Sequence, residues 1–158
     1  MKLFKHGSVI LFLLLTACYH RPQNDPIEMP QVSTQGRYYA SLVFENLSHG
    51  YTDRAQQNLS MALLKSPFDP VVLDTAGYYY EKTGDLKKAN FYYHRAVTTC
   101  TKSAVVNNNY GAFLCRNGAF KPSVKYFLTA ARLSPRCSNI QNQALRNAQY
   151  CYSRVKNL

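Results

Sequence analysis

The last 73 residues of this 158-residue sequence contain no acidic side chain. The last Asp or Glu is Asp85, and every charged residue from 86 to 158 is Lys or Arg. The whole chain has a formal net charge of +11. One face of this segment must therefore be strongly positive, which points to anionic lipid headgroups, cell-wall carboxylates or an acidic protein as partner. The alternative is that the basic residues only solvate the outer faces of helices.

Catalytic and metal-binding motifs are also missing. His49 and His94 do not lie in a recognisable motif with a Ser or Cys nucleophile, and there is no glycine-rich phosphate loop or paired-carboxylate motif. The cysteines are too widely spaced, and the four His too scattered, for a zinc site. We therefore expect neither an enzyme nor a cofactor nor a bound metal.

No apolar run is long enough to span a bilayer, which takes about 20 residues. The apolar stretch Val9–Leu15 follows a short basic head and suits the core of an export signal. It ends in Leu15-Thr16-Ala17-Cys18, which resembles the bacterial lipobox. We predict that residues 1–17 are a signal peptide and that Cys18 becomes the lipidated first residue. An ordinary cleaved signal with a chance Cys is the alternative.

The residues after Cys18 bear on location. Residue 19 is Tyr, whereas Asp at this place retains many lipoproteins in the inner membrane of Gram-negative bacteria. Its absence favours the outer membrane, facing the periplasm, where nucleic acid is not an expected partner. Residues 18–35 contain three prolines and no apolar period, so we predict a flexible tether between lipid and domain.

The remaining sequence repeats with the 34-residue period of tetratricopeptide repeats (TPRs), each of which is a pair of antiparallel helices. The period is kept by two sets of small residues: Gly50, Gly84, Gly118, and Ala62, Ala96, Ala130. We predict an all-α TPR solenoid with repeats at 36–69, 70–103 and 104–137. A partial fourth repeat at 138–158 follows, with a capping helix over 140–155. A generic helical bundle is the alternative.

Other repeat positions refine this prediction. Gly77 and Gly111 share the close-approach position of the first helix, where the first repeat has Val43. A second shared position holds large side chains, at Leu59, Tyr93 and Phe127. Asp85 follows a turn glycine and is expected to cap the next helix. Asn46 and Asn107 depart from the pattern, because their positions are usually apolar.

The first helices of a TPR solenoid line a concave groove that binds peptides. Counting positions within each repeat places eight residues toward that groove: Arg37, Phe44, Asp74, Tyr78, Glu81, Asn108, Ala112 and Arg116. We expect Tyr78 and Arg116 to be the anchors, because Tyr and Arg dominate interface energetics. For Tyr78, packing against a neighbouring helix is the alternative.

Four cysteines follow Cys18: Cys100, Cys115, Cys137 and Cys151. An even number in an exported chain suggests disulfides, because the periplasm is oxidising. Four cysteines allow three pairings, and spacing alone does not choose among them.

Residues 107–118 (Asn-Asn-Asn-Tyr-Gly-Ala-Phe-Leu-Cys-Arg-Asn-Gly) resemble the third repeat of the type IV pilus biogenesis lipoproteins PilF and PilW, which are pilotin-like. Residues 144–151 (Ala-Leu-Arg-Asn-Ala-Gln-Tyr-Cys) are similar to the family's Asn-Ala-Gly-x-Cys segment, with Gln149 at the glycine position. This alignment needs four extra residues after the third repeat, and the family has such an insertion. Family members usually have about six repeats, so we expect a chain shortened at its C-terminus.

The resemblance implies an outer-membrane lipoprotein that supports type IV pilus biogenesis, through assembly or localisation of the secretin ring or stability of the pilus. The implied partner is the secretin or another pilus assembly component. A Cys115–Cys151 disulfide is implied as well, which suits two residues on first helices of adjacent repeats. For Cys100 and Cys137, a second bridge and two free thiols both stay open. The alternative function is a general periplasmic TPR adaptor that tethers envelope proteins or cell-wall enzymes to the outer membrane.

Overall fold

A computed structural model describes residues 34–155 as seven α-helices without a strand. The helices are α1 (Thr34–Ser48), α2 (Thr52–Lys65), α3 (Pro70–Lys82), α4 (Leu86–Thr99), α5 (Ala104–Arg116), α6 (Phe120–Leu133) and α7 (Asn139–Val155). None of these seven is long and apolar enough to cross a membrane. The predicted signal peptide, the lipidation site Cys18 and the tether up to residue 33 lie outside the described residues.

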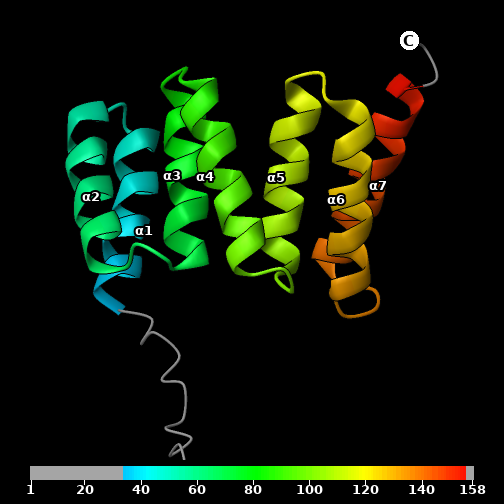
Figure 1. Ribbon diagram of the computed structural model, residues 1–158, viewed down its shortest axis with the longest axis horizontal. Coiled ribbons are helices and arrows are strands. Elements are labelled where there is room, and N and C mark those ends of the chain that lie inside the picture. The colour runs from blue at the N-terminus through cyan, green and yellow to red at the C-terminus, as the bar shows by residue number, and fades with distance from the viewer. Residues whose placement is uncertain (1–33, 156–158) are drawn as a thin grey trace, which may run out of the picture. The chain divides into compact units, whose positions relative to one another are not determined.

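The helices form three antiparallel pairs followed by a lone helix, as the repeat pattern predicts (Figure 1). Within each pair, α1 packs on α2, α3 on α4, and α5 on α6. α7 packs along α6 over a longer surface than α3 shares with α2 or α5 with α4. The predicted all-α TPR solenoid is therefore confirmed, with α7 closing its C-terminal end.

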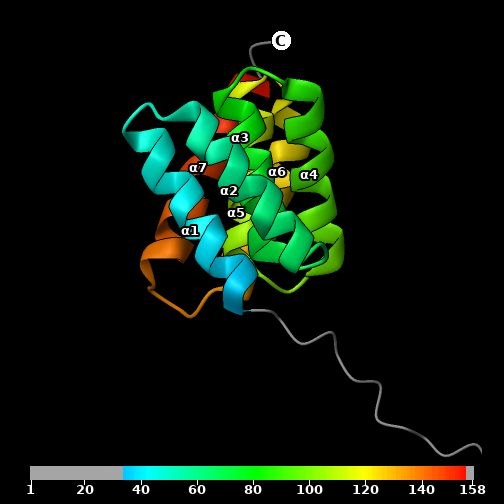
Figure 2. The ribbon, with the colours of Figure 1, turned by 90° about the vertical axis from the view of Figure 1, so that its left-hand side faces the viewer.

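The curvature of the solenoid follows from which helices touch. The first helices of successive pairs are in contact, α1 with α3, α3 with α5, and α5 with α7. The second helices, α2, α4 and α6, do not pack against one another. Because the odd-numbered helices are closer together, they form the concave face, and the even-numbered helices form the opposite face. In Figure 2, which looks along the row of helix pairs, α4 and α6 lie to the right of α3, α5 and α7.

Local sequence signals set the helix ends. The three turn glycines adopt positive φ, at 77° for Gly50, 88° for Gly84 and 79° for Gly118, where a side chain would be strained. The Oδ1 atom of Asp85 accepts a hydrogen bond from the Lys88 N–H at 3.0 Å, which is the predicted cap of α4.

The small and large repeat positions pack against each other. A Cβ atom added to Gly77 would lie 2.6 Å from the Cγ atom of Tyr93, so no larger residue fits there. Gly111 faces Phe127 in the same way in the third pair. In the first pair, Val43 shares a buried cluster with Leu59, whose side chain is smaller. Within each helix pair, the size of the side chain on the first helix therefore limits the size of the side chain that faces it from the second helix.

Two details differ from the sequence prediction. Thr34 and Gln35, assigned to the tether, are the first residues of α1. No proline lies between Pro30 and Gly36, so no proline ring prevents the helix from starting ahead of the buried Gly36. Asn107, which stands at a usually apolar position, is buried and donates through its amide to the carbonyl of Ser103 at 2.8 Å. This hydrogen bond compensates for its burial.

Candidate functional site

The concave face contains a pocket of about 510 Å³. Its lining comes from both neighbouring and distant helices: Phe44, Asp74, Tyr78, Tyr93, Asn108, Asn109, Ala112, Cys115, Arg116, Phe127, Gln143, Asn147, Tyr150 and Cys151. The lining reaches from α1 to α7. Residues that are far apart in the sequence therefore meet at one site.

Six of the eight residues predicted to face the groove line this pocket: Phe44, Asp74, Tyr78, Asn108, Ala112 and Arg116. Glu81 is not part of the lining but is ion-paired with Arg116, which is. Six of the residues that repeat counting assigns to one face of the solenoid therefore lie together at one pocket.

Arg37 does not line the pocket. Its Nε atom donates to the Oδ2 atom of Asp69 at 2.8 Å. Asp69 is only 5% exposed and caps α3, with Oδ1 accepting from the Val71 N–H at 2.8 Å. Arg37 forms an ion pair with this buried carboxylate at the start of α3. Its guanidinium therefore has a structural contact, although its repeat position is one that faces the groove.

Two polar rungs join α3 to α5 across the concave face. The Asn109 amide donates to Asp74 Oδ2 at 2.7 Å, and the Arg116 guanidinium donates to both oxygens of Glu81 at 2.7 and 2.9 Å. Both rungs join residues 35 apart in the sequence. The shared offset means that α3 and α5 keep one register over two helical turns.

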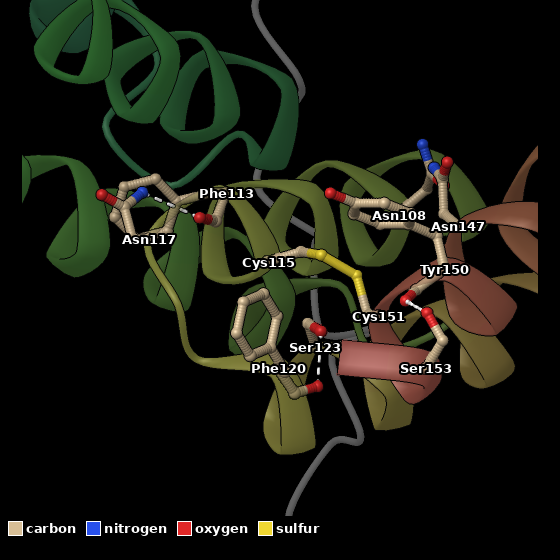
Figure 3. Close-up of a disulfide and its surroundings, with 10 residues drawn as sticks. All are labelled: Asn108, Phe113, Cys115, Asn117, Phe120, Ser123, Asn147, Tyr150, Cys151 and Ser153. Atoms are coloured by element: carbon tan, nitrogen blue, oxygen red, sulfur yellow. Dashed lines mark hydrogen bonds between the residues drawn. A yellow bond between two sulfur atoms is a disulfide. The ribbon is translucent and has the colours of Figure 1, made fainter. Parts of the chain in front are cut away.

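The next pair of first helices keeps the same register. The Asn147 amide of α7 lies 3.5 Å from Oδ1 of Asn108 on α5, and these residues are 39 apart. The four extra residues expected after the third repeat account for the difference from 35. Figure 3 shows Asn108 and Asn147 on the same side of the structure as Tyr150, next to the bond between Cys115 and Cys151.

That bond is the disulfide implied by the family resemblance. It joins α5 to α7 with a Cα–Cα distance of 6.2 Å. Cys151 is 1% exposed and packs with Phe127 and Ala148. The bridge therefore lies at the junction of the last helix pair with the capping helix.

Cys100 and Cys137 are free thiols, so the second bridge that the sequence left open is not formed. A disulfide needs Cα atoms within about 7 Å. The helices that precede these residues, α4 and α6, do not pack against each other. Cys137 is exposed in the turn before α7, where its N–H donates to Gln141 Oε1 at 2.8 Å.

Asp74 is the most unusual group at the pocket. The residue is 8% exposed, and its Oδ1 atom is buried without a hydrogen-bond partner among residues 34–155. Burial raises the pKa of its carboxyl from 3.8 to about 7, although the hydrogen bond from Asn109 acts in the opposite direction. A buried carboxylate with one unsatisfied oxygen is costly to the fold, and such groups concentrate at functional sites.

Glu81 is satisfied, in contrast to Asp74. It accepts the two Arg116 hydrogen bonds and a third from the Tyr93 hydroxyl at 3.0 Å. Burial is the largest cause that raises the pKa of Tyr93, and the negative charge of Glu81 adds to it. The hydrogen bond to Glu81 raises the pKa of Arg116. Both side chains therefore keep their protons and act only as donors.

Two aromatic rings form one wall of the pocket. The centroids of Phe44 and Tyr78 lie 4.9 Å apart at an interplanar angle of 34°. The Nζ atom of Lys82 lies over the Tyr78 ring, 5.4 Å from its centroid. Tyr78 thus packs against a ring of the neighbouring helix α1 and also lines the pocket, and its role as a binding anchor stays a prediction.

Sequence reasoning missed the contribution of α7. Gln143, Asn147 and Tyr150 line the pocket and are spaced by four and three residues, the spacing of one helix face. Repeat counting stopped at Arg116 because the period slips after the third repeat. The helical spacing within α7, combined with the expected four-residue insertion, could have identified them.

The basic half of the chain carries exposed cations on its outer side. Lys121, Lys125 and Arg132 follow one face of α6, with Leu128 between them at 50% exposure. Within residues 86–155, only Lys88 and Arg116 form ion pairs with other described residues. Residues 34–155 contain no cluster of three or more His, Cys, Asp or Glu that could hold a metal ion.

No protein-family model matches the sequence, and no curated protein matches it. Solved structures do match. PilF from Pseudomonas aeruginosa aligns with a TM-score of 0.70 at 21% identity, over 77% of this chain and 54% of PilF. PilW, a widely conserved type IV pilus biogenesis factor, aligns with a TM-score of 0.71 at 23% identity, over 79% of this chain and 56% of PilW.

A third match is the Yersinia enterocolitica type III secretion chaperone SycD, solved with a peptide of the translocator YopD. It aligns with a TM-score of 0.64 at 14% identity, over 80% of this chain and 97% of SycD. At these identities the three structures establish the fold that this chain shares with them. The chain spans little more than half the length of the two pilus proteins.

Proposed function

We propose that this protein is a non-enzymatic TPR scaffold that binds a segment of a protein partner along its concave face. The observation that carries the proposal is the pocket, which runs from Phe44 of α1 to Tyr150 of α7 and is lined mainly by amide and aromatic side chains. Amides can pair with the backbone of an extended segment, and aromatic rings supply apolar contact area. The peptide in the SycD structure supports this mode of binding for the shared fold.

The pilus is the proposed setting of this scaffold. Residues 107–118 resemble the third repeat of the PilF and PilW lipoproteins, and both proteins share this fold. The Cys115–Cys151 bridge is the one that the resemblance implies. On this basis the protein would assist assembly or localisation of the pilus secretin, or stabilise the pilus, from the periplasmic side of the outer membrane. A general periplasmic adaptor is the alternative.

Deletion of the gene tests the pilus role. We expect fewer SDS-resistant secretin multimers or fewer surface pili, restored by a plasmid copy of the wild-type gene. Complementation with Asn108→Ala, which alters the pocket, should restore less than Lys125→Ala, which alters the exposed face of α6. Normal secretin multimers together with normal pili in the deletion strain would refute the pilus role and favour the adaptor.

The membrane anchor needs its own test. The proposal places Cys18 at the N-terminus of the mature protein as the acylated residue, with the domain held at the outer membrane. We expect Cys18→Ser to move the protein from the outer-membrane fraction to the soluble periplasmic fraction. Cys100→Ser, which changes a thiol in the folded domain, is the matched control and should stay with the membrane. A Cys18→Ser protein that remains in the outer-membrane fraction would contradict the anchor.

A further inference from the structure

The carboxylate of Asp74 identifies the chemistry that the pocket is built to receive. Asp74 lines the pocket, and Oδ2 is held by the Asn109 amide at 2.7 Å. Oδ1 has no donor among residues 34–155, although it is buried. An unsatisfied buried acceptor costs free energy until a donor reaches it. The pocket is where such a donor can approach from outside the chain.

Asp74 and Glu81, the two acidic residues of α3 near the pocket, differ in whether a cation pairs with them. Glu81 is neutralised by Arg116 through two hydrogen bonds. Asp74 has only the neutral amide of Asn109, so its ionised form carries a negative charge that no described ion pair compensates. A ligand that brings a positive charge would supply both the missing donor and the missing counter-charge.

The groups that face Asp74 come from several helices. The charge of Asp74 acts on Tyr93 of α4, and Arg116 of α5 lines the same pocket, where it is paired with Glu81 of α3. The α1 contribution is the apolar ring of Phe44, and that of α7 includes the phenol of Tyr150. Among these groups only Arg116 is cationic, and it is already paired with Glu81.

The aromatic wall suits a long side chain that ends in a charge. Phe44 and Tyr78 form a ring pair beside Asp74, and Phe44 is 42% exposed. The methylene stem of Lys or Arg packs well on aromatic faces, and the cationic head is attracted to them. Asn108 and Asn147 lie on the α7 side of the same pocket, where amides can pair with the backbone that carries such a side chain.

We propose that the pocket binds a basic side chain, Arg or Lys, of the partner segment, with Oδ1 of Asp74 accepting a hydrogen bond from its charged head and Phe44 and Tyr78 enclosing its stem. This rests on the proposed function, because it assumes that a protein segment lies along the concave face. It adds the residue class that the segment must contain.

Short peptides test the proposal directly. Four probes of the form acetyl-Ala-X-Ala-amide, with X as Arg, Lys, norleucine or Glu, are titrated into the folded domain and followed by ¹H–¹⁵N NMR. The Arg and Lys probes should cause saturable shifts of the Asn109 and Asn147 side-chain amides. They should bind about tenfold or more tightly than norleucine, which has the stem without the charge. The Glu probe should not bind.

Asp74→Asn should abolish the preference for the Arg and Lys probes over norleucine. Asp53→Asn is the matched control, because it removes one exposed negative charge from α2 and should leave the preference intact. Thermal unfolding checks that both variants are folded. If Asp74→Asn does not fold, the pH dependence of binding by the wild-type protein tests the proposal instead. The affinity of the wild-type protein for the Arg probe should rise between pH 6 and pH 8 as Asp74 ionises.

Three results would overturn the proposal. These are equal binding of the norleucine and Arg probes, an unchanged preference in a folded Asp74→Asn variant, and no saturable binding of any probe. The first two would leave the concave face as a peptide-binding surface of a different specificity. Loss of the scaffold role itself is detected independently, by complementation in the deletion strain, so the two failures are distinguishable.

Discussion

Arg116 on α5 holds both carboxylate oxygens of Glu81 on α3, at 2.7 and 2.9 Å. Tyr93 on α4 donates its hydroxyl to the same carboxylate at 3.0 Å. A single acidic side chain thus links three helices from two adjacent repeats. Its partners differ in burial, because Tyr93 is 2% exposed whereas the Arg116 side chain is 55% exposed.

This difference predicts unequal effects of substitution. Glu81→Ala should lower the free energy of unfolding by about 2–3 kcal/mol, because it leaves the buried Tyr93 hydroxyl without an acceptor. Arg116→Ala should lower it by less, because it removes the half-exposed partner and leaves the hydrogen bond from Tyr93 to Glu81 in place. Urea unfolding measures both. Glu45→Ala on the exposed side of α1 is the control, and an equal loss for Glu81→Ala and Glu45→Ala would contradict the assignment.

The disulfide between Cys115 and Cys151 should contribute about 3–4 kcal/mol to stability, because it closes a loop between residues 36 apart. We expect the double variant Cys115→Ala and Cys151→Ala to lose about that amount in urea unfolding, and a reducing agent to have the same effect on the wild type. The matched control replaces Cys100 and Cys137 with Ala. A loss in the control as large as in the first variant would show that the bridge itself contributes little.

The packing of Gly77 against Tyr93 predicts a specific rescue. Gly77→Ala should destabilise the protein by about 1–3 kcal/mol, because the new Cβ atom would overlap the ring of Tyr93. Adding Tyr93→Leu imitates the first repeat, where the facing residues are Val43 and Leu59. The double variant should therefore be less destabilised than the sum of the two single variants, as measured by denaturant unfolding. Strict additivity would mean that the two positions are not coupled.

Asp74 gives the protein a characteristic pH dependence. Its pKa is raised from 3.8 to about 7 in the folded state, so the folded chain binds the proton more tightly than the unfolded chain. The contribution of this group to stability should therefore be greatest below about pH 4 and decline as the pH rises through 7. The decline is on the order of 4 kcal/mol at most.

Comparing wild type with Asp74→Asn isolates this contribution, because the other carboxyl groups are common to both proteins. Asp85, for example, has a lowered pKa, through hydrogen bonds from Lys88, and changes stability in the opposite direction. Urea unfolding at pH values from 4 to 8 should show Asp74→Asn gaining stability relative to wild type as the pH rises. Parallel curves for the two proteins would mean that Asp74 titrates normally.

The sequence predicted those features that repeat with a fixed period. Gly84 and Gly118 sit at equivalent turns, and only a backbone with positive φ needs glycine there, so their spacing located the helix pairs. The groove face followed from the same counting, because residues at one repeat position face the same side of the solenoid. Tyr78 and Arg116, which the repeat positions assign to the groove, both line the pocket.

Features that depend on a single contact were not predictable in this way. Arg37 has the right repeat position, yet the buried Asp69 carboxylate attracts its guanidinium away from the groove. The missing partner of Asp74 Oδ1 is a property of three-dimensional packing, and no sequence pattern reports it. The position of Tyr150 at the pocket was not predicted, because the four-residue insertion interrupts the 34-residue period before α7.

The bridge from Cys115 to Cys151 makes the two ends of the pocket mechanically unequal. At one end, α7 with Asn147 and Tyr150 is joined covalently to α5. At the other end, Phe44 is carried by α1, which is held by side-chain packing and by the ion pair between Arg37 and Asp69, without a disulfide among the described residues. A partner segment bound as proposed would therefore contact a covalently braced helix at α7 and a non-covalently held helix at α1, so we expect any adjustment to a bulky side chain to occur on the Phe44 side.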